Sequence, residues 1–210
     1  AYKNFGASVT LFAGSDGTNT IAVYSDIATG ADRSFYIYKG SGTSYTEELT
    51  DFTPSDYTDS GHYSLMNGSN WFSLDKTDAN GGNTLAIGAA GDNVGGGDTG
   101  SLYVYTRSGS TWTQQSKIQA SIKGPSGGAK FGGAVAFGDS GAGIAVSAPY
   151  DDQSQPSGGV MYIVTGNGWY QKQKLTTPSP VAEERFGVSV DFDNDGAKLV
   201  VGARYYNSQQ

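Results

Sequence analysis

Ile144-Ala145-Val146-Ser147-Ala148 is a short apolar stretch that ends in small residues, and stretches of this kind occur four times in the chain. The other three are Ile21-Ala22-Val23-Tyr24-Ser25, Leu85-Ala86-Ile87-Gly88-Ala89 and Leu199-Val200-Val201-Gly202-Ala203. Their first residues are 64, 59 and 55 positions apart. Short aliphatic runs bounded by glycine and polar residues are typical of β-strands. Their recurrence at a similar interval indicates a repeat architecture.

Three further strands are predicted around each copy, in the same order. The first is an alternating apolar strand, represented by Val9/Leu11, Phe72/Leu74, Val135/Phe137 and Val190/Phe192. Its period of two predicts that these residues share one buried face. After each copy except the last comes a strand that carries tyrosine, at 35–38, 102–105 and 161–164, and then one opened by Tyr45, Trp112 or Trp169.

A unit of four short strands is too small to bury both faces of its own sheet, so neighbouring units must cover one another. The β-propeller, with its four-stranded antiparallel blades, meets this requirement. We therefore predict an all-β β-propeller and divide the chain into blade 1 (1–50), blade 2 (65–119), blade 3 (129–176) and half of blade 4 (184–210). With about 3.5 blades, the chain is expected to be a partial propeller, part of a larger ring, or an array that closes through other copies.

A further motif opens three of the units and carries a family resemblance. It is present as Phe5-Gly6-Ala7-Ser8-Val9, Phe131-Gly132-Gly133-Ala134-Val135 and Phe186-Gly187-Val188-Ser189-Val190. In the last two units a segment similar to Val-Gly-Ala-Pro follows, at 145–149 and 201–204. This pattern resembles the FG-GAP repeat, which forms the blades of the integrin α-subunit propeller and of many bacterial and algal surface proteins. Blade 2 departs from it, with Gly68-Ser69 in place of Phe-Gly, and blade 1 has Tyr24-Ser25-Asp26 in place of Gly-Ala-Pro.

Composition and charge exclude several classes of protein. Glycine accounts for 32 of 210 residues, and charged residues for only 16%, which disfavours a helix-rich fold and a charged disordered chain. The net charge of -7 repels nucleic acid. No apolar run has the ~18 residues of a membrane helix, so no membrane insertion is expected. The absence of cysteine excludes disulfides and a thiolate site.

Two short motifs that could suggest an enzyme are not supported by their context. Residues 95–100 satisfy GxGxxG, but a strand follows them rather than the helix that a phosphate site needs. Residues 124–128 satisfy GxSxG, but they lie between blades and lack the strand-turn-helix elbow of a serine hydrolase. We therefore predict that the chain is not an enzyme.

The resemblance also implies where a ligand would bind. In integrins the ligand face is formed by the loops between the second and third strands and by those that join blades. Carried over by position, the candidate residues are Asp92, Asn93, Asp98, Tyr150, Asp151 and Asp152. Trp71 has no counterpart in the other blades, so it is a candidate for stacking on a sugar, with core packing as the alternative.

Calcium is the only cofactor that the resemblance suggests. Integrin-like blades bind it through a pattern such as Asp-x-Asp-x-Asp-Gly-x-x-Asp, and Asp191, Asp193 and Asp195 followed by Gly196 match the first part. The ninth position is Leu199, and Lys198 adds a positive charge, although Ca²⁺ prefers six to eight oxygen ligands. The alternative is a turn whose side chains cap their own backbone.

The leading functional prediction is an extracellular or cell-surface propeller for adhesion, surface recognition or assembly of an extracellular structure. Its partner would be a protein or glycan on a surface, further copies of itself, or the remainder of the propeller. A carbohydrate-binding lectin and an accessory domain of a larger secreted enzyme are the alternatives. Asn67-Gly68-Ser69 fits an N-glycosylation acceptor, which matters only in an organism that glycosylates its exported proteins.

Overall fold

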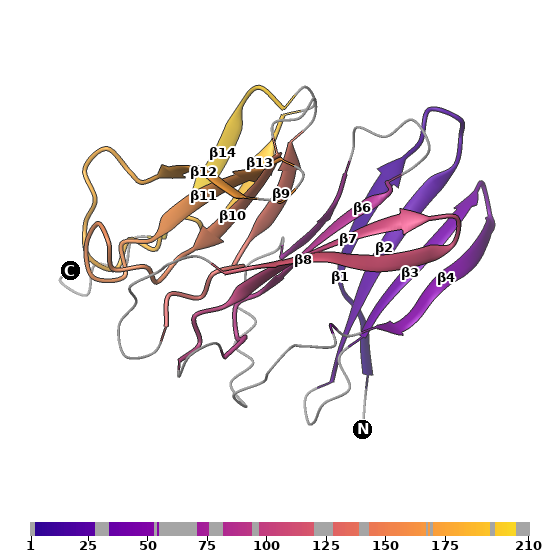
Figure 1. Cartoon of the computed structure of the whole chain (residues 1–210), viewed down its shortest axis with the longest axis horizontal. Helices are drawn as coiled ribbons and strands as arrows, with labels where there is room; N and C mark the ends of the chain where they lie inside the picture. The colour runs from indigo at the N-terminus through magenta and orange to yellow at the C-terminus, as the bar shows by residue number, and fades with distance from the viewer. Residues whose placement is uncertain are drawn as a thin grey trace.

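In the computed structural model every regular element is a β-strand, within the ranges that it describes (Figure 1). These ranges are 3–27, 34–52, 54, 71–75, 82–93, 97–119, 128–138, 143–166, 168, 170–193 and 196–204. The strands are β1 (Lys3–Ala13), β2 (Asn19–Ile27), β3 (Ser34–Ser41), β4 (Ser44–Phe52), β5 (Phe72–Leu74), β6 (Thr84–Ala89), β7 (Ser101–Ser108), β8 (Thr111–Ile118), β9 (Val135–Gly138), β10 (Gly143–Ala148), β11 (Val160–Thr165), β12 (Tyr170–Leu175), β13 (Ser189–Phe192) and β14 (Leu199–Gly202). Within the same ranges no helix is long and apolar enough to span a membrane.

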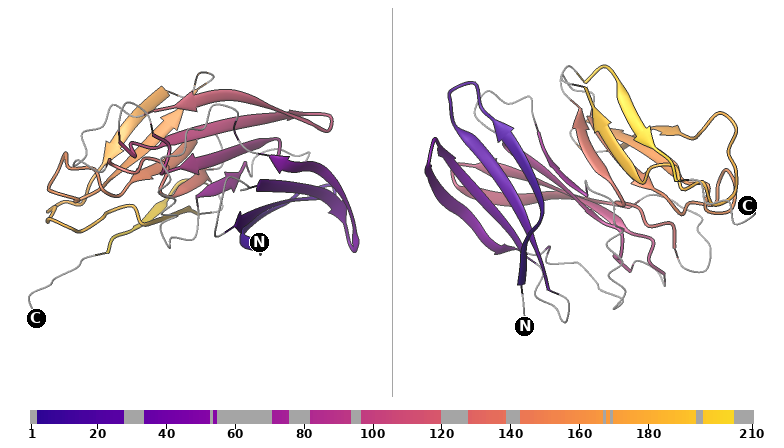
Figure 2. Two further views of the ribbon diagram at one scale, coloured as in Figure 1. Left: turned by 90° about the horizontal axis from the view of Figure 1, so that it is seen from below. Right: turned by 180° about the vertical axis from the view of Figure 1, so that it is seen from behind.

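Consecutive strands pair antiparallel, so each sheet follows the order of the chain. Strands β1 to β4, β5 to β8 and β9 to β12 form three four-stranded sheets, and β13 pairs with β14. Tight turns join the third and fourth strands of blades 1 and 2, with Gly42 at φ 57° between β3 and β4 and Gly109 at φ 63° between β7 and β8, because two-residue hairpin turns require positive φ. The sheets succeed one another across the molecule from the indigo to the yellow end (Figures 1 and 2). The predicted all-β fold of four-stranded antiparallel blades is confirmed, and the arrangement fits a partial β-propeller.

Each complete blade in the middle of the chain uses one face against the blade before it and the other against the blade after it. We call these the leading and the trailing face. In blade 2 the leading face carries Leu85 and Tyr103, which pack with blade 1. Its trailing face carries Ala86 and Val104, which pack with blade 3. Because neighbouring residues of a strand point to opposite faces, the apolar runs supply two cores at once.

The junction of blades 3 and 4 shows how the two faces complement each other in size. On the trailing face of blade 3, Ala134, Ala136 and Ala145 present small side chains. Val190 of the leading face of blade 4 packs against them and is 3% exposed, and Phe192 joins the same cluster. The same trailing face also carries Met161 and Ile163, so the leading residues of blade 4 pack on a mixture of alanines and larger apolar side chains.

The buried alternation predicted for the first strands is wrong in blade 1. Val9 and Leu11 are each 57% exposed, whereas the equivalent Leu74 and Val135 are buried. In β1 the neighbouring Phe12 points to the opposite face and is buried in the core with blade 2. Val9 and Leu11 lie on the leading face of blade 1, and no blade in the described part of the chain packs on that face.

The tryptophans that the structure describes belong to the core between blades 1 and 2. Trp71 is 9% exposed, and its ring stands edge-on to Tyr24, with 4.1 Å between the centroids. Phe35 and Phe72 surround it at 5.4 and 5.2 Å. Trp112 is equally buried in the same cluster. The position of Trp71 is thus that of a core residue, which is the alternative to sugar stacking. Trp169 lies outside the described residues.

Candidate functional site

The Phe-Gly dipeptides of blades 3 and 4 fasten each blade to a loop of the blade before it. The backbone N–H of Phe131 donates to the carbonyl of Thr99 over 2.9 Å, in the loop between β6 and β7. The N–H of Phe186 donates to the carbonyl of Gly158 over the same distance, in the loop between β10 and β11. We call each of these contacts a clasp. Two of the loops that the sequence indicated as binding loops, those after β6 and β10, are thus held at the blade junctions.

The clasp needs unusual backbone conformations, and this explains its glycines. Gly132 and Gly187, which follow the two phenylalanines, have φ of 91° and 99°. A Cβ atom on Gly132 would stand 2.7 Å from the backbone nitrogen of Ala89, so the space is closed as well. In blade 1 the Phe5-Gly6 pair lies inside β1 instead, next to a bulge in its pairing with β2.

Asp92 and Asp151, both predicted as ligand-binding residues, are completely buried. The Asp92 carboxylate accepts hydrogen bonds from Ser101 Oγ at 2.6 Å and from the Tyr103 hydroxyl at 2.9 Å. It also pairs with Lys117, whose Nζ lies 2.9 Å away. Buried carboxylates need such partners, so Asp92 ties the loop after β6 to strands β7 and β8. This position corrects the expectation that Asp92 is free to meet a ligand.

Blade 3 repeats this arrangement around Asp151. The Tyr162 hydroxyl donates to its carboxylate over 2.6 Å, and the backbone N–H of Gln153 donates over 2.8 Å. Burial raises the pKa of Asp151, although the Tyr162 hydrogen bond acts in the opposite direction. Burial also raises the pKa of Tyr162. The same correction applies here, since Asp151 stabilises its own loop.

The remaining predicted loop residues, Asn93, Asp98, Tyr150 and Asp152, are partly buried. Asp98 forms an ion pair with Lys130 across the junction of blades 2 and 3. The Arg185 guanidinium of blade 4 lies over the Tyr150 ring, 4.8 Å from its centroid. The Asp152 carboxylate accepts the backbone N–H of Ser157 at 2.7 Å, within its own loop. Asn93 lies next to the buried Asp92. Most of these side chains therefore join blades or shape loops.

The predicted calcium loop is a turn in the part that the structure describes. The carboxylate of Asp193 accepts the backbone N–H of Lys198 at 2.8 Å, and the Lys198 Nζ lies 3.4 Å from its other oxygen. The Asp191 carboxylate accepts the N–H of Phe192 at 2.9 Å. Asp195 lies outside the described residues. Within the described ranges no group of three or more potential metal ligands occurs.

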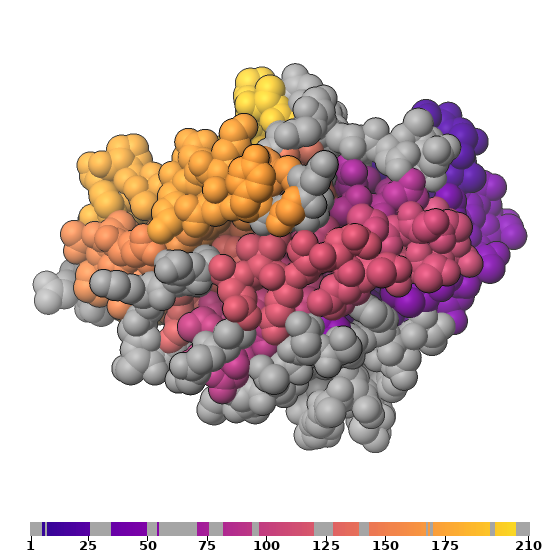
Figure 3. All heavy atoms as spheres, viewed as in Figure 1, coloured from indigo at the N-terminus to yellow at the C-terminus, as the bar shows by residue number. Residues whose placement is uncertain are grey.

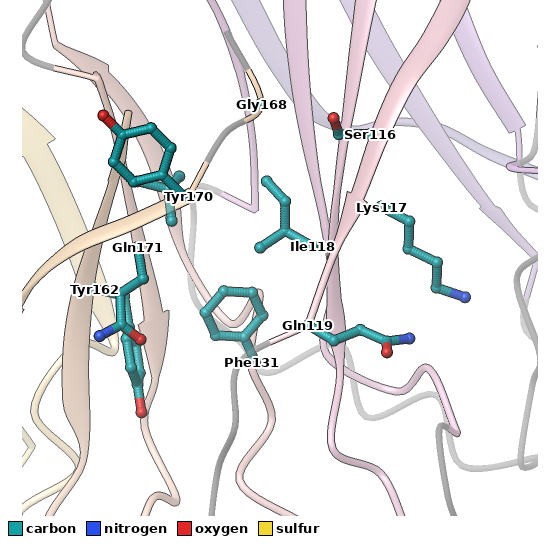
Figure 4. A pocket seen from close by; sticks show the side chains of 10 residues that line it. Ser116, Lys117, Ile118, Gln119, Phe131, Tyr162, Gly168, Tyr170 and Gln171 are labelled. Carbon is teal, nitrogen blue, oxygen red and sulfur yellow. The ribbon is translucent and has the colours of Figure 1, made fainter. Parts of the chain in front are cut away.

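A groove that sequence analysis did not predict lies between β8 of blade 2 and strands β11 and β12 of blade 3 (Figure 4). It has a volume of about 410 Å³. The residues around it are Ser116, Lys117, Ile118, Gln119, Phe131, Tyr162, Val164, Gly168, Tyr170 and Gln171. Ile118 and Phe131 meet at its centre in Figure 4, whereas the Tyr170 ring is directed away from Ile118. Strands β8 and β12 lie on the face shown in Figure 3, where the pink surface borders the orange one.

The groove opens here because small residues replace large ones relative to the junction of blades 1 and 2. The register-equivalent pairs are Leu49 and Ser116, Tyr105 and Val164, and Arg107 and Gly166. At the first junction Arg107 pairs with Glu48 of blade 1 and closes the outer end of the interface. Gly166 cannot do so. These replacements are present in the sequence of the repeats, but they can be recognised only when the strand register shows which positions are equivalent.

Taken together, the consecutive four-stranded sheets and the Phe-Gly clasps define a class of protein, an all-β repeat protein with propeller-type blades. Residues 112–164 and 169–210 match the family model of the FG-GAP repeat. The part of the chain from 112 to 210 therefore consists of FG-GAP repeats, as the motifs at 131–135 and 186–190 predicted. A search of curated proteins gave no match.

Proposed function

We propose that this chain is a non-enzymatic, extracellular module that recognises a surface or assembles an extracellular structure. The observation that carries this proposal is the FG-GAP match, because such repeats typically occur in extracellular or surface proteins of the adhesion type. The clasps support it, since they fix long loops on a rigid scaffold, where binding residues are commonly found. With Asp92 and Asp151 buried, the accessible part of the loop after β10 is represented by the exposed Gln153, Gln155 and Pro156.

The test is binding of the labelled, purified chain to cell-surface extracts and to a glycan array. A loop variant, Gln155→Arg with Pro156→Arg, should weaken binding at least several-fold. The matched control is Ser110→Arg, because Ser110 is exposed in the β7–β8 turn, at the opposite end of the antiparallel blade from the binding loops. No binding by the native chain, or equal binding by the loop variant and the control, would contradict recognition through this loop.

Carbohydrate binding is a second candidate, and the groove between blades 2 and 3 favours it. Ile118 and Phe131 offer an apolar floor, and Ser116 and Gln171 offer hydroxyl and amide groups for sugar hydroxyls. The Lys117 ammonium is neutralised by Asp92, so a neutral sugar is the ligand class that fits. Titration calorimetry with simple neutral sugars tests this. Gln171→Ala should weaken binding and Gln173→Ala, on the other face of β12, should not; equal effects would place the sugar elsewhere.

A further inference from the structure

The leading face of blade 1 carries several exposed apolar side chains, although Val23, which pairs with Val9 on this face, is only 6% exposed. Val9 and Leu11 are more than half exposed on it. Ile21 pairs with Leu11 and Tyr38 pairs with Ile21, so both share this face, and each is partly exposed. Four large side chains on neighbouring strands form a continuous patch. A surface of this kind usually marks an interaction site.

The register of the sheets shows what covers the same face in the other blades. In blade 3 the equivalents of Val9 and Leu11 are Val135 and Phe137, which are 1% and 3% exposed because blade 2 packs on them. In blade 4 the equivalent Val190 packs on blade 3. At both junctions the occupant is the trailing face of another blade. The junctions inside the chain therefore show that a trailing face is the kind of surface that packs on a leading face.

The trailing face of blade 4 also carries an exposed apolar side chain. Val200 lies on it and is 71% exposed. By register, Val200 is equivalent to Ala145 and Asp191 to Ala136, the small residues on which blade 4 itself rests. The chain thus presents a leading face with large side chains in blade 1 and a trailing face with smaller ones in blade 4.

We propose that copies of this chain associate head to tail, with the leading face of blade 1 of one copy packed on the trailing face of blade 4 of the next. The contact would continue the stacking seen at the junctions inside the chain. It joins two different surfaces, so it is heterologous and generates a ring or an open array. Asp191 would weaken the contact, because its carboxylate, which accepts the N–H of Phe192, loses water when an apolar face covers it.

Sedimentation equilibrium of the 210-residue chain over a range of concentrations tests this. The native chain should show masses above 21.9 kDa that increase with concentration. Leu11→Lys disables one face and Val200→Lys the other, so each variant alone should be monomeric. An equimolar mixture of the two should give a dimer that grows no further, because each pair retains one intact contact. Asp191→Ala should strengthen the association of the native chain several-fold.

Controls separate this contact from misfolding and general adhesiveness. The three substitutions are at exposed positions, so each variant should retain the far-UV circular dichroism spectrum of the native chain. Tyr170→Lys changes an aromatic side chain that is 65% exposed and lies outside both faces, and it should leave association unchanged. A native chain that stays monomeric would overturn the proposal. So would association that survives Val200→Lys but not Leu11→Lys, since two leading faces would then be in contact.

This inference deepens the assembly part of the proposed function, and on that part it rests. Its test uses the purified chain alone, whereas recognition is tested against surface extracts and glycans. A chain that binds a surface but remains monomeric would refute head-to-tail association only. A chain that associates but binds no surface would refute recognition only.

Discussion

Gly132 combines a backbone requirement and a steric one in a single position of the clasp. Its φ of 91° strains any other residue, and its missing side chain leaves room for β6 and β7. We predict that Gly132→Ala lowers the free energy of unfolding by about 3 kcal/mol or more, from strain and overpacking together. Gly109→Ala, with φ of 63° and no atom near the added Cβ, should cost only about 1–2 kcal/mol. Urea unfolding of both variants measures the difference, and equal losses would remove the steric part of the explanation.

Asp151 makes the stability of blade 3 dependent on pH. Burial raises its pKa above the ordinary 3.8, so the folded state binds this proton more readily than the unfolded state does. The contribution of Asp151 to stability should therefore increase as the pH falls through the raised pKa, and level off below about 3.8. The measurement is the unfolding free energy of the native chain minus that of Asp151→Asn, between pH 7 and pH 3.5. A difference that shrinks on acidification would show that the hydrogen bonds of the carboxylate outweigh its burial.

Strands β5 and β1 are equivalent in their blades, but β5 is buried between two blades and the leading side of β1 is exposed. Leu74 in β5 is 2% exposed between blades 1 and 2, and its equivalent Leu11 in β1 is 57% exposed. Leu74→Ala should cost about 2–5 kcal/mol, because it leaves a cavity in a packed core. Leu11→Ala should cost about 1 kcal/mol at most, since most of that side chain stays in water. Thermal or urea unfolding, carried out at a concentration where the chain is monomeric, gives both values; similar losses would mean that the leading face of blade 1 is covered.

The hairpin of β13 and β14 should fold without calcium. The Asp193 carboxylate is already engaged by the backbone and the ammonium group of Lys198. We therefore expect the same Tm in millimolar Ca²⁺ and in excess chelator, because a cation that binds only the folded state would raise it. Differential scanning calorimetry with Mg²⁺ as a control makes the comparison. A rise in Tm specific to Ca²⁺ would assign Asp195 and its neighbours a role as ligands.

Across the whole molecule, stability is distributed over the junctions between sheets rather than held in one central core. Among the described residues, three buried clusters lie between successive blades, and each combines a leading face with a trailing face. Repeat proteins of this kind gain stability from nearest-neighbour contacts. The exposed apolar side chains of blades 1 and 4 lie on faces that neighbouring blades cover at the junctions inside the chain, and for this reason self-association is predicted from whole blades rather than from any one strand.

The strands and the order of the sheets were predictable because they depend on local pattern. Alternation around Phe72 and Leu74 and the repeated small residues after Ile144 specify strands and their turns without any distant contact. The exposure of Val9 and the burial of Asp92 were not predictable in this way. Both depend on which surface packs on the residue. The loop that contains Asp92 is as polar as an exposed loop, so its composition does not reveal that the carboxylate is buried.

The sequence by itself therefore determined the blade, its four strands and its FG-GAP motifs, because hydrophobic period and glycine-rich turns act over a few residues. Only the tertiary structure decided which loop side chains are engaged at the junctions, where the groove between β8 and β11 opens, and which apolar side chains stay exposed. Those outcomes depend on the register and packing of sheets that are about 60 residues apart in the chain. Whether a side chain fills a junction or leaves a gap depends on the volume of the side chains on the facing sheet.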